Sequence, residues 1–212
     1  MDILQILKAR RVIAILRGVP EERIEDTARA LYDGGVTCIE VTFDQSSADG
    51  ETTAARSIER LSRGGLILPG AGTVMTARQV ETAYRAGARY IISPNVDAEV
   101  IARTRELGLV SIPGAFTPTE AAYAYQCGAQ IVKLFPASVL GTAYIKALRG
   151  PYPHIPLAAV GGISSANARA FLDAGCVCVS AGGALADMRV IRAGEWAALT
   201  DAARTLVESI NA

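Results

Sequence analysis

The chain has 212 residues, of which 50% are hydrophobic and 20% charged, and its formal net charge is zero. This composition is typical of a folded protein rather than a disordered one, and the length suits one domain over residues 1–212. A balanced charge offers no basic face for a nucleic acid or a membrane, so we expect neither as a partner. Residues 1–11 mix charged with apolar side chains and lack a secretory layout, so we expect a cytoplasmic protein.

Short apolar segments recur along the chain, and amphipathic helical stretches separate them. At Gly35, Gly87, Gly128 and Gly175 a helix end, a glycine cap and the start of an apolar strand follow one another, which forms a weak internal repeat. The predicted strands cover residues 11–17, 37–43, 66–72, 89–93, 109–113, 130–135, 155–160 and 176–181.

Near-continuous apolar strands that are each followed by a helix indicate a parallel sheet covered on both faces. We therefore predict an α/β protein with a (β/α)8 TIM barrel and a short N-terminal helix. A doubly wound open sheet is the alternative, but no GxGxxG motif follows the first strand. In such a barrel the reactive side chains come from the carboxyl ends of the strands.

Lys133 stands out because the chain has three lysines and this one lies in an apolar strand pattern, residues 131–135. Burial disfavours the ammonium form and lowers the pKa of the amine, which can then attack a carbonyl group. A structural lysine paired with a buried carboxylate would leave the same pattern, and the strand alone does not separate the two interpretations.

Glu40 is a carboxylate in another apolar strand, and strand alternation places it on one face with Thr42. If that face lines the barrel, Glu40 can meet Lys133. A salt bridge is one interpretation. The other is a proton shuttle, because aldol cleavage needs a base for a hydroxyl group and later an acid for an enamine.

Two glycine pairs, Gly161-Gly162 and Gly182-Gly183, end the last two predicted strands. Each is followed within two residues by a predicted helix start. Glycine amides at helix N-termini form anion-binding nests, and the last two strands of such barrels commonly hold a substrate phosphate. The two pairs together predict a phosphate site.

The cysteines and the single histidine offer few metal ligands. Cys176 and Cys178 lie two apart on a predicted strand and should share a face, but no CxxC motif or nearby histidine accompanies them. Buried apolar cysteines are therefore favoured over a redox or metal pair. His154 lies in a turn-like segment and is expected at the surface. We expect no metal and no other cofactor.

Eight motifs spread over nearly the whole chain occur together: IAILRG (13–18), IEVT (39–42), GAGTV (70–74), SPN (93–95), IPG (112–114), TPTE (117–120), VKLFPA (132–137) and VGGI (160–163). In order and spacing they resemble the 2-keto-3-deoxy-6-phosphogluconate / 4-hydroxy-2-oxoglutarate aldolase family, including its 2-keto-3-deoxy-6-phosphogalactonate members. The resemblance implies a metal-independent class I aldolase that commonly assembles as a homotrimer.

By position, the resemblance implies that Lys133 is the Schiff-base lysine and Glu40 the general acid/base. Thr73 corresponds to a threonine that helps to hold the pyruvyl carboxylate. The remaining implied substrate contacts are pocket walls at Pro94 and Phe135 and phosphate-loop positions at Gly161, Gly162, Gly182 and Gly183.

Two positions depart from the family pattern. Phosphogluconate-type members often carry a carboxylate-binding arginine four residues after the glutamate, where this chain has Asp44, and Arg17 at the end of the first strand is our candidate replacement. Some members carry a serine on the last phosphate loop, where this chain has Gly183, so a hydroxyl contact is lost while backbone amides remain. These departures concern the substrate rather than the chemistry.

We therefore expect a small-molecule substrate: a 2-keto-3-deoxy-6-phospho sugar acid, of the gluconate or galactonate series, cleaved to pyruvate and glyceraldehyde 3-phosphate. Three alternatives remain open. The first is a 4-hydroxy-2-oxoglutarate aldolase that releases glyoxylate. The second is a non-catalytic phosphate-binding barrel in which Lys133 and Glu40 form a structural ion pair. The third is a phosphosugar isomerase or epimerase, which would need a second acid/base group such as Asp44.

Overall fold

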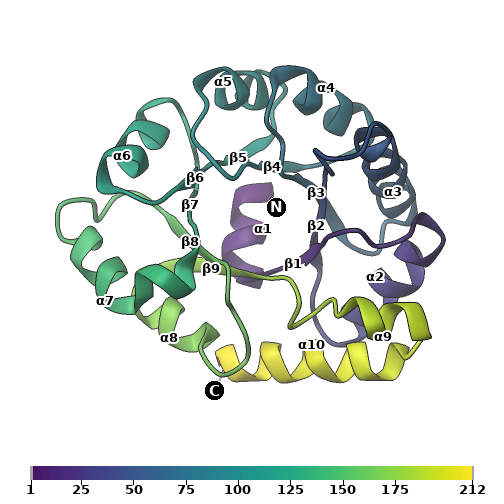
Figure 1. Cartoon of the computed structure of the whole chain (residues 1–212). Coiled ribbons are helices and arrows are strands. Elements are labelled where there is room, and N and C mark those ends of the chain that lie inside the picture. The colour runs from purple at the N-terminus through teal and green to yellow at the C-terminus, as the bar shows by residue number, and fades with distance from the viewer. Residues whose placement is uncertain (1, 212) are drawn as a thin grey trace.

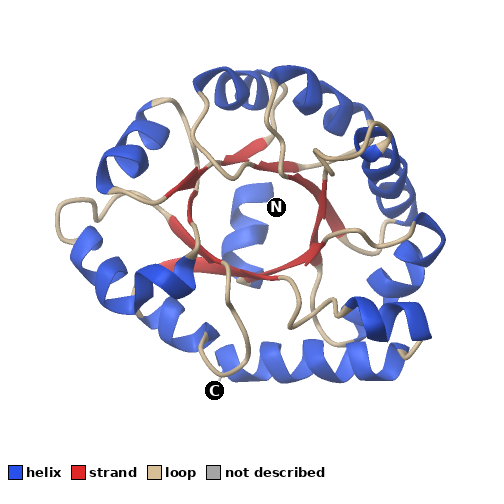
Figure 2. Ribbon diagram, viewed as in Figure 1, coloured by secondary structure: helices blue, strands red, loops and turns tan. Residues whose placement is uncertain are grey.

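A computed structural model describes residues 2–211, in which a ring of parallel strands is surrounded by helices (Figure 1). The strands form a ring inside the helices (Figure 2), and their order is β5-β4-β3-β2-β1-β9-β8-β7-β6, as labelled in Figure 1. The strands are β1 (Val12–Leu16), β2 (Cys38–Thr42), β3 (Leu68–Gly72), β4 (Tyr90–Ile92), β5 (Val110–Ile112), β6 (Gly114–Ala115), β7 (Val132–Leu134), β8 (Leu157–Val160) and β9 (Cys176–Ala181).

β5 and β6 belong to one chain segment that is interrupted at Pro113, a residue without an N–H group for the ladder. β5 pairs with β4 and β6 pairs with β7, so this single segment brings the two ends of the sheet together. Each of the eight predicted strands is present within two residues of its expected bounds. The predicted TIM-type barrel is confirmed, and the open doubly wound sheet is wrong.

Helices cover the outside of the ring, and four of those described, α4, α5, α6 and α9, begin at a side chain that caps the first turn. Thr76 accepts a hydrogen bond from the Gln79 N–H at the start of α4, and Thr117 and Glu120 form a reciprocal capping box at the start of α6. None of the described helices is long and apolar enough to cross a membrane. The helices are α2 (Ile24–Asp33), α3 (Gly50–Gly64), α4 (Ala77–Arg85), α5 (Ala98–Glu106), α6 (Pro118–Gln126), α7 (Ala137–Arg149), α8 (Ala168–Asp173), α9 (Met188–Ala193) and α10 (Trp196–Asn211), with a 3-10 turn η1 (Glu21–Arg23) before α2.

The predicted N-terminal helix is present as α1 (Ile3–Arg10), which lies across the centre of the ring (Figure 1). Its Leu7 is 1% exposed and packs with apolar side chains inside the barrel, among them Ile13, Tyr90 and Ile112. Apolar side chains therefore fill the amino-terminal end of the barrel. The carboxyl ends of the strands are left to form a cavity.

Cys176 and Cys178 do not share a face, contrary to the sequence-based expectation. Leu157 pairs with Cys176 and Ala158 with Cys178, so Val177 is an extra residue in β9, a β-bulge that shifts the alternation. Cys178 packs inside the barrel, whereas Cys176 packs in the core between the strands and the outer helices. The bulge separates the two thiols and removes the redox or metal pair.

Candidate active site

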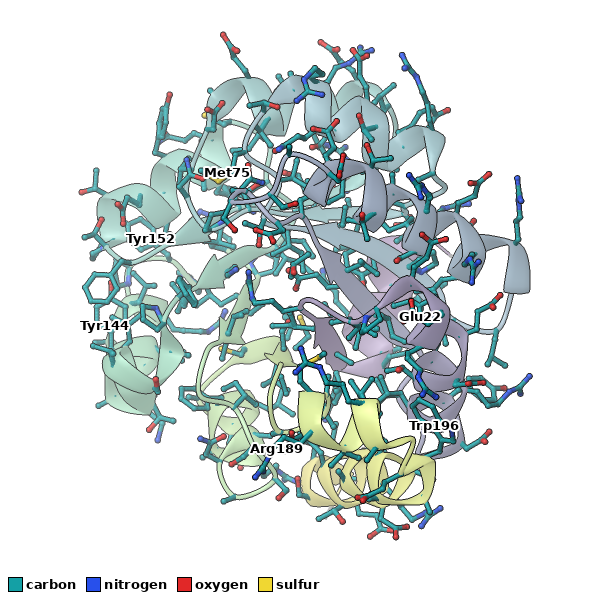
Figure 3. All side chains as sticks on the ribbon, turned by 45° about the vertical axis from the view of Figure 1, so that its right-hand side comes forward. Glu22, Met75, Tyr144, Tyr152, Arg189 and Trp196 are labelled. Carbon is teal, nitrogen blue, oxygen red and sulfur yellow. The ribbon has the colours of Figure 1, made fainter. Side chains whose placement is uncertain are left out.

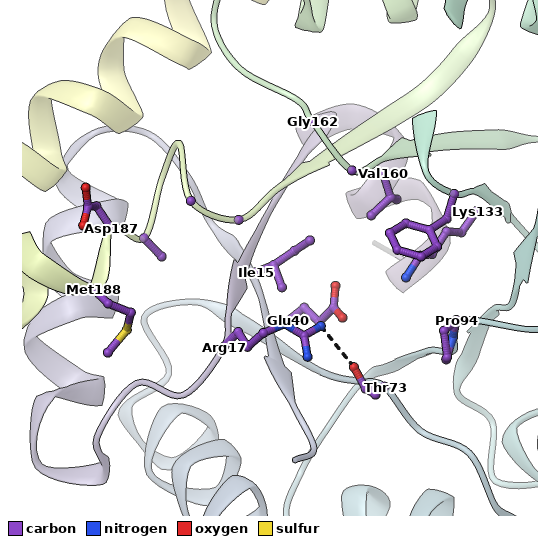
Figure 4. Close-up of a pocket in the computed structure, with 15 residues that line it drawn as sticks. Ile15, Arg17, Glu40, Thr73, Pro94, Lys133, Val160, Gly162, Asp187 and Met188 are labelled. Atoms are coloured by element: carbon purple, nitrogen blue, oxygen red, sulfur yellow. Dashed lines mark hydrogen bonds between the residues drawn. The ribbon is translucent and has the colours of Figure 1, made fainter. Parts of the chain in front are cut away.

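A cavity of about 830 Å³ opens at the carboxyl ends of the strands. All ten residues singled out from the sequence line it (Figure 4): Arg17, Glu40, Thr73, Pro94, Lys133, Phe135, Gly161, Gly162, Gly182 and Gly183. They are separated by as many as 166 positions, from 17 to 183, and come together because each lies on a parallel strand of the same barrel or in the loop that follows one.

Lys133 lies in the middle of β7, between Gly114 of β6 and Ala158 of β8. Its side chain is 7% exposed, and its Nζ atom lies 4.7 Å from the centre of the Phe135 ring. Burial lowers the pKa of this amine, the positive charge of Arg17 lowers it further, and the Glu40 carboxylate opposes both effects. The amine is therefore both directed into the cavity and biased toward its nucleophilic form.

Glu40 lies in β2, between Ile15 of β1 and Gly70 of β3, and is 2% exposed. Among the described residues, its Oε2 atom has no hydrogen-bond partner. Burial raises the pKa of the carboxyl group, while the charges of Lys133 and Arg17 lower it. A carboxyl group with a raised pKa can exchange protons closer to neutral pH, which suits a general acid/base.

The salt bridge between Lys133 and Glu40 that the sequence left open is absent from the part of the chain that the structure describes. Both side chains point into the same cavity (Figure 4), yet neither satisfies the other. A structural ion pair would require direct contact, so the interpretation of Lys133 as a purely structural lysine loses its basis. The space between the two groups is open to a bound molecule.

Arg17 and Thr73 form a polar corner of the cavity. The Arg17 guanidinium donates a 3.4 Å hydrogen bond to Thr73 Oγ1 (Figure 4). Thr73 directly follows β3 and has a φ of 57°, a left-handed conformation that a threonine rarely adopts. A guanidinium beside a hydroxyl group is an arrangement that binds a carboxylate.

Asp44 is exposed and does not line the cavity. Its carboxylate accepts hydrogen bonds from the N–H and the hydroxyl group of Ser46, which lower the pKa of Asp44. The Asp44 carboxylate is therefore bonded to Ser46 and takes no part in the wall of the cavity. The second acid/base group required by the isomerase or epimerase alternative is not supplied by Asp44.

Bare backbone forms the wall of the cavity at the ends of β8 and β9. Gly161 and Gly162 both have positive φ, 95° and 73°, which would strain any larger residue. Among the described residues, the N–H groups of Gly162 and Gly183 donate to no backbone or side-chain acceptor. The loops can therefore offer amide hydrogens to an anion.

The expectation that helices start within two residues of these glycine pairs is wrong, because α8 begins at Ala168 and α9 at Met188. After β8, the Asn167 side chain accepts the N–H of Ser164 and donates to the carbonyl of Gly162, which keeps this stretch in a turn. The amides that face the cavity thus belong to turns rather than to first helical turns.

Five further residues line the cavity that the sequence did not single out: Ile15, Val160, Ala186, Asp187 and Met188. Ile15 lies on β1, two residues before Arg17. Strand alternation puts the two side chains on the same face and could have predicted that Ile15 lines the cavity. Asp187 had no such signal, because it enters the wall only through the path of the loop before α9. Its side chain accepts hydrogen bonds from Arg189, which lower the pKa of Asp187 to about 2.

In residues 2–211, no group of three or more His, Cys, Asp or Glu side chains is placed to hold a metal ion.

Residues 3–202 match the family model for KDPG and KHG aldolase, where KDPG is 2-keto-3-deoxy-6-phosphogluconate and KHG is 4-hydroxy-2-oxoglutarate. The "Probable 2-dehydro-3-deoxy-6-phosphogalactonate aldolase" of Rhizobium meliloti is 43% identical over 159 residues, 74% of this chain and 73% of that protein. The 2-dehydro-3-deoxy-phosphogluconate aldolase of Treponema pallidum is 35% identical over 204 residues, 94% of this chain and 93% of that protein. The crystal structure of KDPG aldolase from Legionella pneumophila, with pyruvate captured at low pH as a covalent carbinolamine intermediate, has a TM-score of 0.85 at 26% identity and covers 97% of this chain and 98% of that one.

Proposed function

Because the chain belongs to the KDPG and KHG aldolase family, we propose that Lys133 is the amine that forms a Schiff base with its substrate. Membership makes the chain a class I aldolase, an aldehyde-lyase that cleaves a 2-keto-3-deoxy-6-phospho sugar acid to pyruvate and glyceraldehyde 3-phosphate. The observation that carries the role of Lys133 is its position: of the described lysines it alone lines the cavity, buried and with a lowered pKa. The carbinolamine in the Legionella protein is the adduct that an amine gives with pyruvate, which supports this role.

The reaction begins when the Lys133 amine attacks the C2 ketone and loses water to give an imine. The protonated imine withdraws electrons from the C3–C4 bond. Glu40 removes the proton of the C4 hydroxyl group, the C3–C4 bond breaks, and the aldehyde leaves with a new carbonyl group. Glu40 then returns a proton to C3 of the enamine, and water releases pyruvate from Lys133. The raised pKa of Glu40 suits it to both proton transfers.

The two charged ends of the substrate are held by different groups of the cavity wall. Arg17 and Thr73 bind the C1 carboxylate, since they are the guanidinium and hydroxyl pair of the polar corner. The amides of the β8 and β9 glycine loops bind the 6-phosphate. Pro94 and Phe135 form apolar walls of the cavity, and the Phe135 ring lies against the Lys133 amine.

For the substrate itself, we propose that the galactonate epimer is cleaved faster than the gluconate epimer. Two observations support this preference: the higher identity to the Rhizobium protein, and Asp44 in place of the arginine of many phosphogluconate-type members. The preference is measured as the kcat/KM for pyruvate release from both 6-phospho epimers and from 4-hydroxy-2-oxoglutarate. A higher kcat/KM on the gluconate epimer refutes the preference, and a higher value on 4-hydroxy-2-oxoglutarate refutes the need for a phosphate.

Reductive trapping tests the mechanism. Borohydride added with pyruvate should reduce the imine to a stable adduct, and peptide mapping should find that adduct on Lys133. Lys133→Met should abolish both the adduct and pyruvate release, whereas Lys146→Met, a lysine of α7 outside the cavity, should leave both unchanged. An adduct on another lysine, or none in the wild type, would disprove the role of Lys133.

We also propose that the chain assembles as a homotrimer through an aromatic surface on α6 and α7. This surface consists of Phe116, Tyr123, Tyr125 and Val139, which are 38% to 70% exposed, with the half-buried Tyr144, whose hydroxyl group donates to the Phe116 carbonyl. Tyr144 and Tyr152 lie on the same side of the molecule (Figure 3). Several large exposed apolar side chains on neighbouring segments support a contact with another protein.

Light scattering of the eluting protein should give three times the 22.2 kDa mass of one chain. Tyr123→Glu should reduce that mass, because it puts a charge into the proposed contact. Tyr84→Glu is the matched control, since Tyr84 is 48% exposed but lies on α4. A monomeric wild type, or a trimer that Tyr123→Glu leaves intact, contradicts the proposed surface.

A further inference from the structure

The loop between β3 and α4 carries Thr73 in a strained conformation. A φ of 57° costs a residue with a side chain about 1–2 kcal/mol, so such conformations persist only where surrounding contacts impose them. The hydroxyl group of Thr73 accepts from Arg17 inside the cavity, but that single 3.4 Å bond is long. Other groups must therefore determine where this loop lies.

Two glutamine side chains connect the two ends of this loop. The N–H of Met75 donates to Gln79 Oε1 at 2.7 Å, and Gln79 Nε2 donates to Gln45 Oε1 at 3.1 Å. Gln45 Nε2 then donates to the carbonyl of Thr73 at 2.7 Å. The three bonds form a closed clamp that starts and ends on the backbone of the same loop. We call this pair of side chains the glutamine clamp.

The orientation of both amides in the glutamine clamp follows from the backbone. The Met75 N–H can only donate, so Gln79 must present its oxygen there; the Thr73 carbonyl can only accept, so Gln45 must present its NH2 group. These two requirements leave the remaining nitrogen of Gln79 facing the remaining oxygen of Gln45. Neither amide can turn over without losing two of the three bonds.

The position of Gln45 follows from its neighbours. Asp44 accepts from both the N–H and the hydroxyl group of Ser46, a local turn that has Gln45 at its centre and directs Asp44 away from the cavity. Gln79 is 7% exposed on the first turn of α4, which Thr76 caps. One partner of the clamp is thus held by a turn and the other by a helix.

We propose that Gln45 and Gln79 are positioning residues that hold Thr73, and through it Arg17, in the geometry that binds the substrate carboxylate. This inference rests on the proposed role of Arg17 and Thr73 at that carboxylate. Neither glutamine lines the cavity, so each acts only through the loop.

Gln79→Glu tests the proposal with an almost unchanged shape. The new carboxylate still accepts from Met75 but offers no hydrogen to Gln45, so the chain to Thr73 is broken. Gln130→Glu is the matched control, because Gln130 Oε1 accepts from the Ser111 N–H outside the cavity and keeps that bond after the same change. The readout is the concentration of pyruvate that gives half-maximal inactivation by borohydride, measured beside the maximal rate of inactivation.

In Gln79→Glu we expect pyruvate to bind about tenfold more weakly, while the maximal inactivation rate at saturating pyruvate stays within about twofold. Lowering the pH until the new carboxyl group is protonated restores a donor toward Gln45, so the ratio of variant to wild-type affinity should return toward one. Gln130→Glu should match the wild type throughout. If Gln79 had only a structural role, Gln79→Glu would lower the melting temperature without weakening pyruvate binding selectively over the maximal inactivation rate.

Wild-type pyruvate affinity in Gln79→Glu overturns the proposal. If that variant does not fold, Gln45→Glu carries the same test, because Gln45 is exposed and its change removes the donor to Thr73 directly. Failure of the clamp and failure of the proposed function are distinguishable. A wild type that forms no adduct at Lys133 refutes the function, whereas a wild type that traps pyruvate and variants that bind it equally well refute only the clamp.

Discussion

The carboxylate of Glu40 lies directly against Gly72 on the neighbouring strand. A methyl group at Gly72 would be only 1.7 Å from Glu40 Oε1, far inside contact distance. The register places Gly72 opposite Thr42, two residues beyond Glu40 on β2, so the missing side chain leaves room for the bend of the carboxylate into the cavity. Gly72 therefore determines where the Glu40 carboxylate, the proposed proton-transferring group, lies.

Gly72→Ala should lower turnover by at least about 100-fold, because a shift of about 1 Å in a catalytic group has an effect of this size. The φ of Gly72 is compatible with alanine, so the displaced group is Glu40 rather than the backbone. Pyruvate trapping at Lys133 should persist and would show that the barrel is intact. Gly64→Ala is the control, since no atom lies within 4 Å of the added methyl group. Wild-type turnover in Gly72→Ala would contradict the placement of Glu40.

The pH at which the Lys133 amine becomes reactive should move in opposite directions in two variants. Glu40 raises and Arg17 lowers the pKa of Lys133, which burial holds below its usual value of 10.5. Imine formation requires the unprotonated amine, so its rate rises with pH through that pKa. Glu40→Gln should shift the rise to lower pH, and Arg17→Leu should shift it to higher pH. The initial rate of borohydride trapping as a function of pH measures both, and shifts in the same direction would be inconsistent with this electrostatic account.

Glu40 should reduce the stability of the protein at neutral pH. Its pKa in the folded state is raised above the ordinary value of 4.5, so ionisation costs folding free energy that appears as the pH rises through that value. Comparing Lys133→Met with Lys133→Met/Glu40→Gln removes the compensating charge of the lysine. At pH 8 the free energy of unfolding of the double variant should exceed that of Lys133→Met by about 1–3 kcal/mol, because the double variant lacks a buried unsatisfied carboxylate. This difference should vanish near pH 4, where the carboxyl group is protonated.

Urea unfolding at the two pH values measures this difference, since each variant should unfold in a single cooperative transition. A gain that is equally large at both pH values would point to packing rather than ionisation. A double variant that is less stable at neutral pH would show that the environment of Glu40 satisfies its charge.

Gly183→Ser should improve binding of a phosphorylated substrate. The position is open, with no atom within 4 Å of an added Cβ, and its φ is not in the left-handed region. A hydroxyl group there adds one hydrogen bond to a charged phosphate, which lowers KM for the 6-phospho substrate up to about tenfold. Steady-state kinetics on the phosphorylated substrate and on 4-hydroxy-2-oxoglutarate, which has no phosphate, shows whether the change in KM depends on the phosphate. An equal change in KM for both would place the phosphate elsewhere.

Much of the site was predictable because its signals are local. The alternation around Glu40 and the apolar neighbours of Lys133 show which side chains lie on buried strands, and eight parallel strands bring their carboxyl ends to one cavity. The bulge at Val177 was not predictable, since an extra residue in β9 is defined only by its pairing with β8.

The sequence by itself determined the barrel, the family and the lysine and glutamate that face the cavity, because hydrophobic period and motif order depend on neighbours along the chain. Only the tertiary structure decided that Lys133 and Glu40 stay apart, that Arg17 enters the cavity, and that Gln45 meets Gln79. Those outcomes depend on distances between residues 23 to 93 positions apart, here Arg17 with Glu40 and Glu40 with Lys133, and such distances are set by packing and by the burial of charge rather than by local pattern.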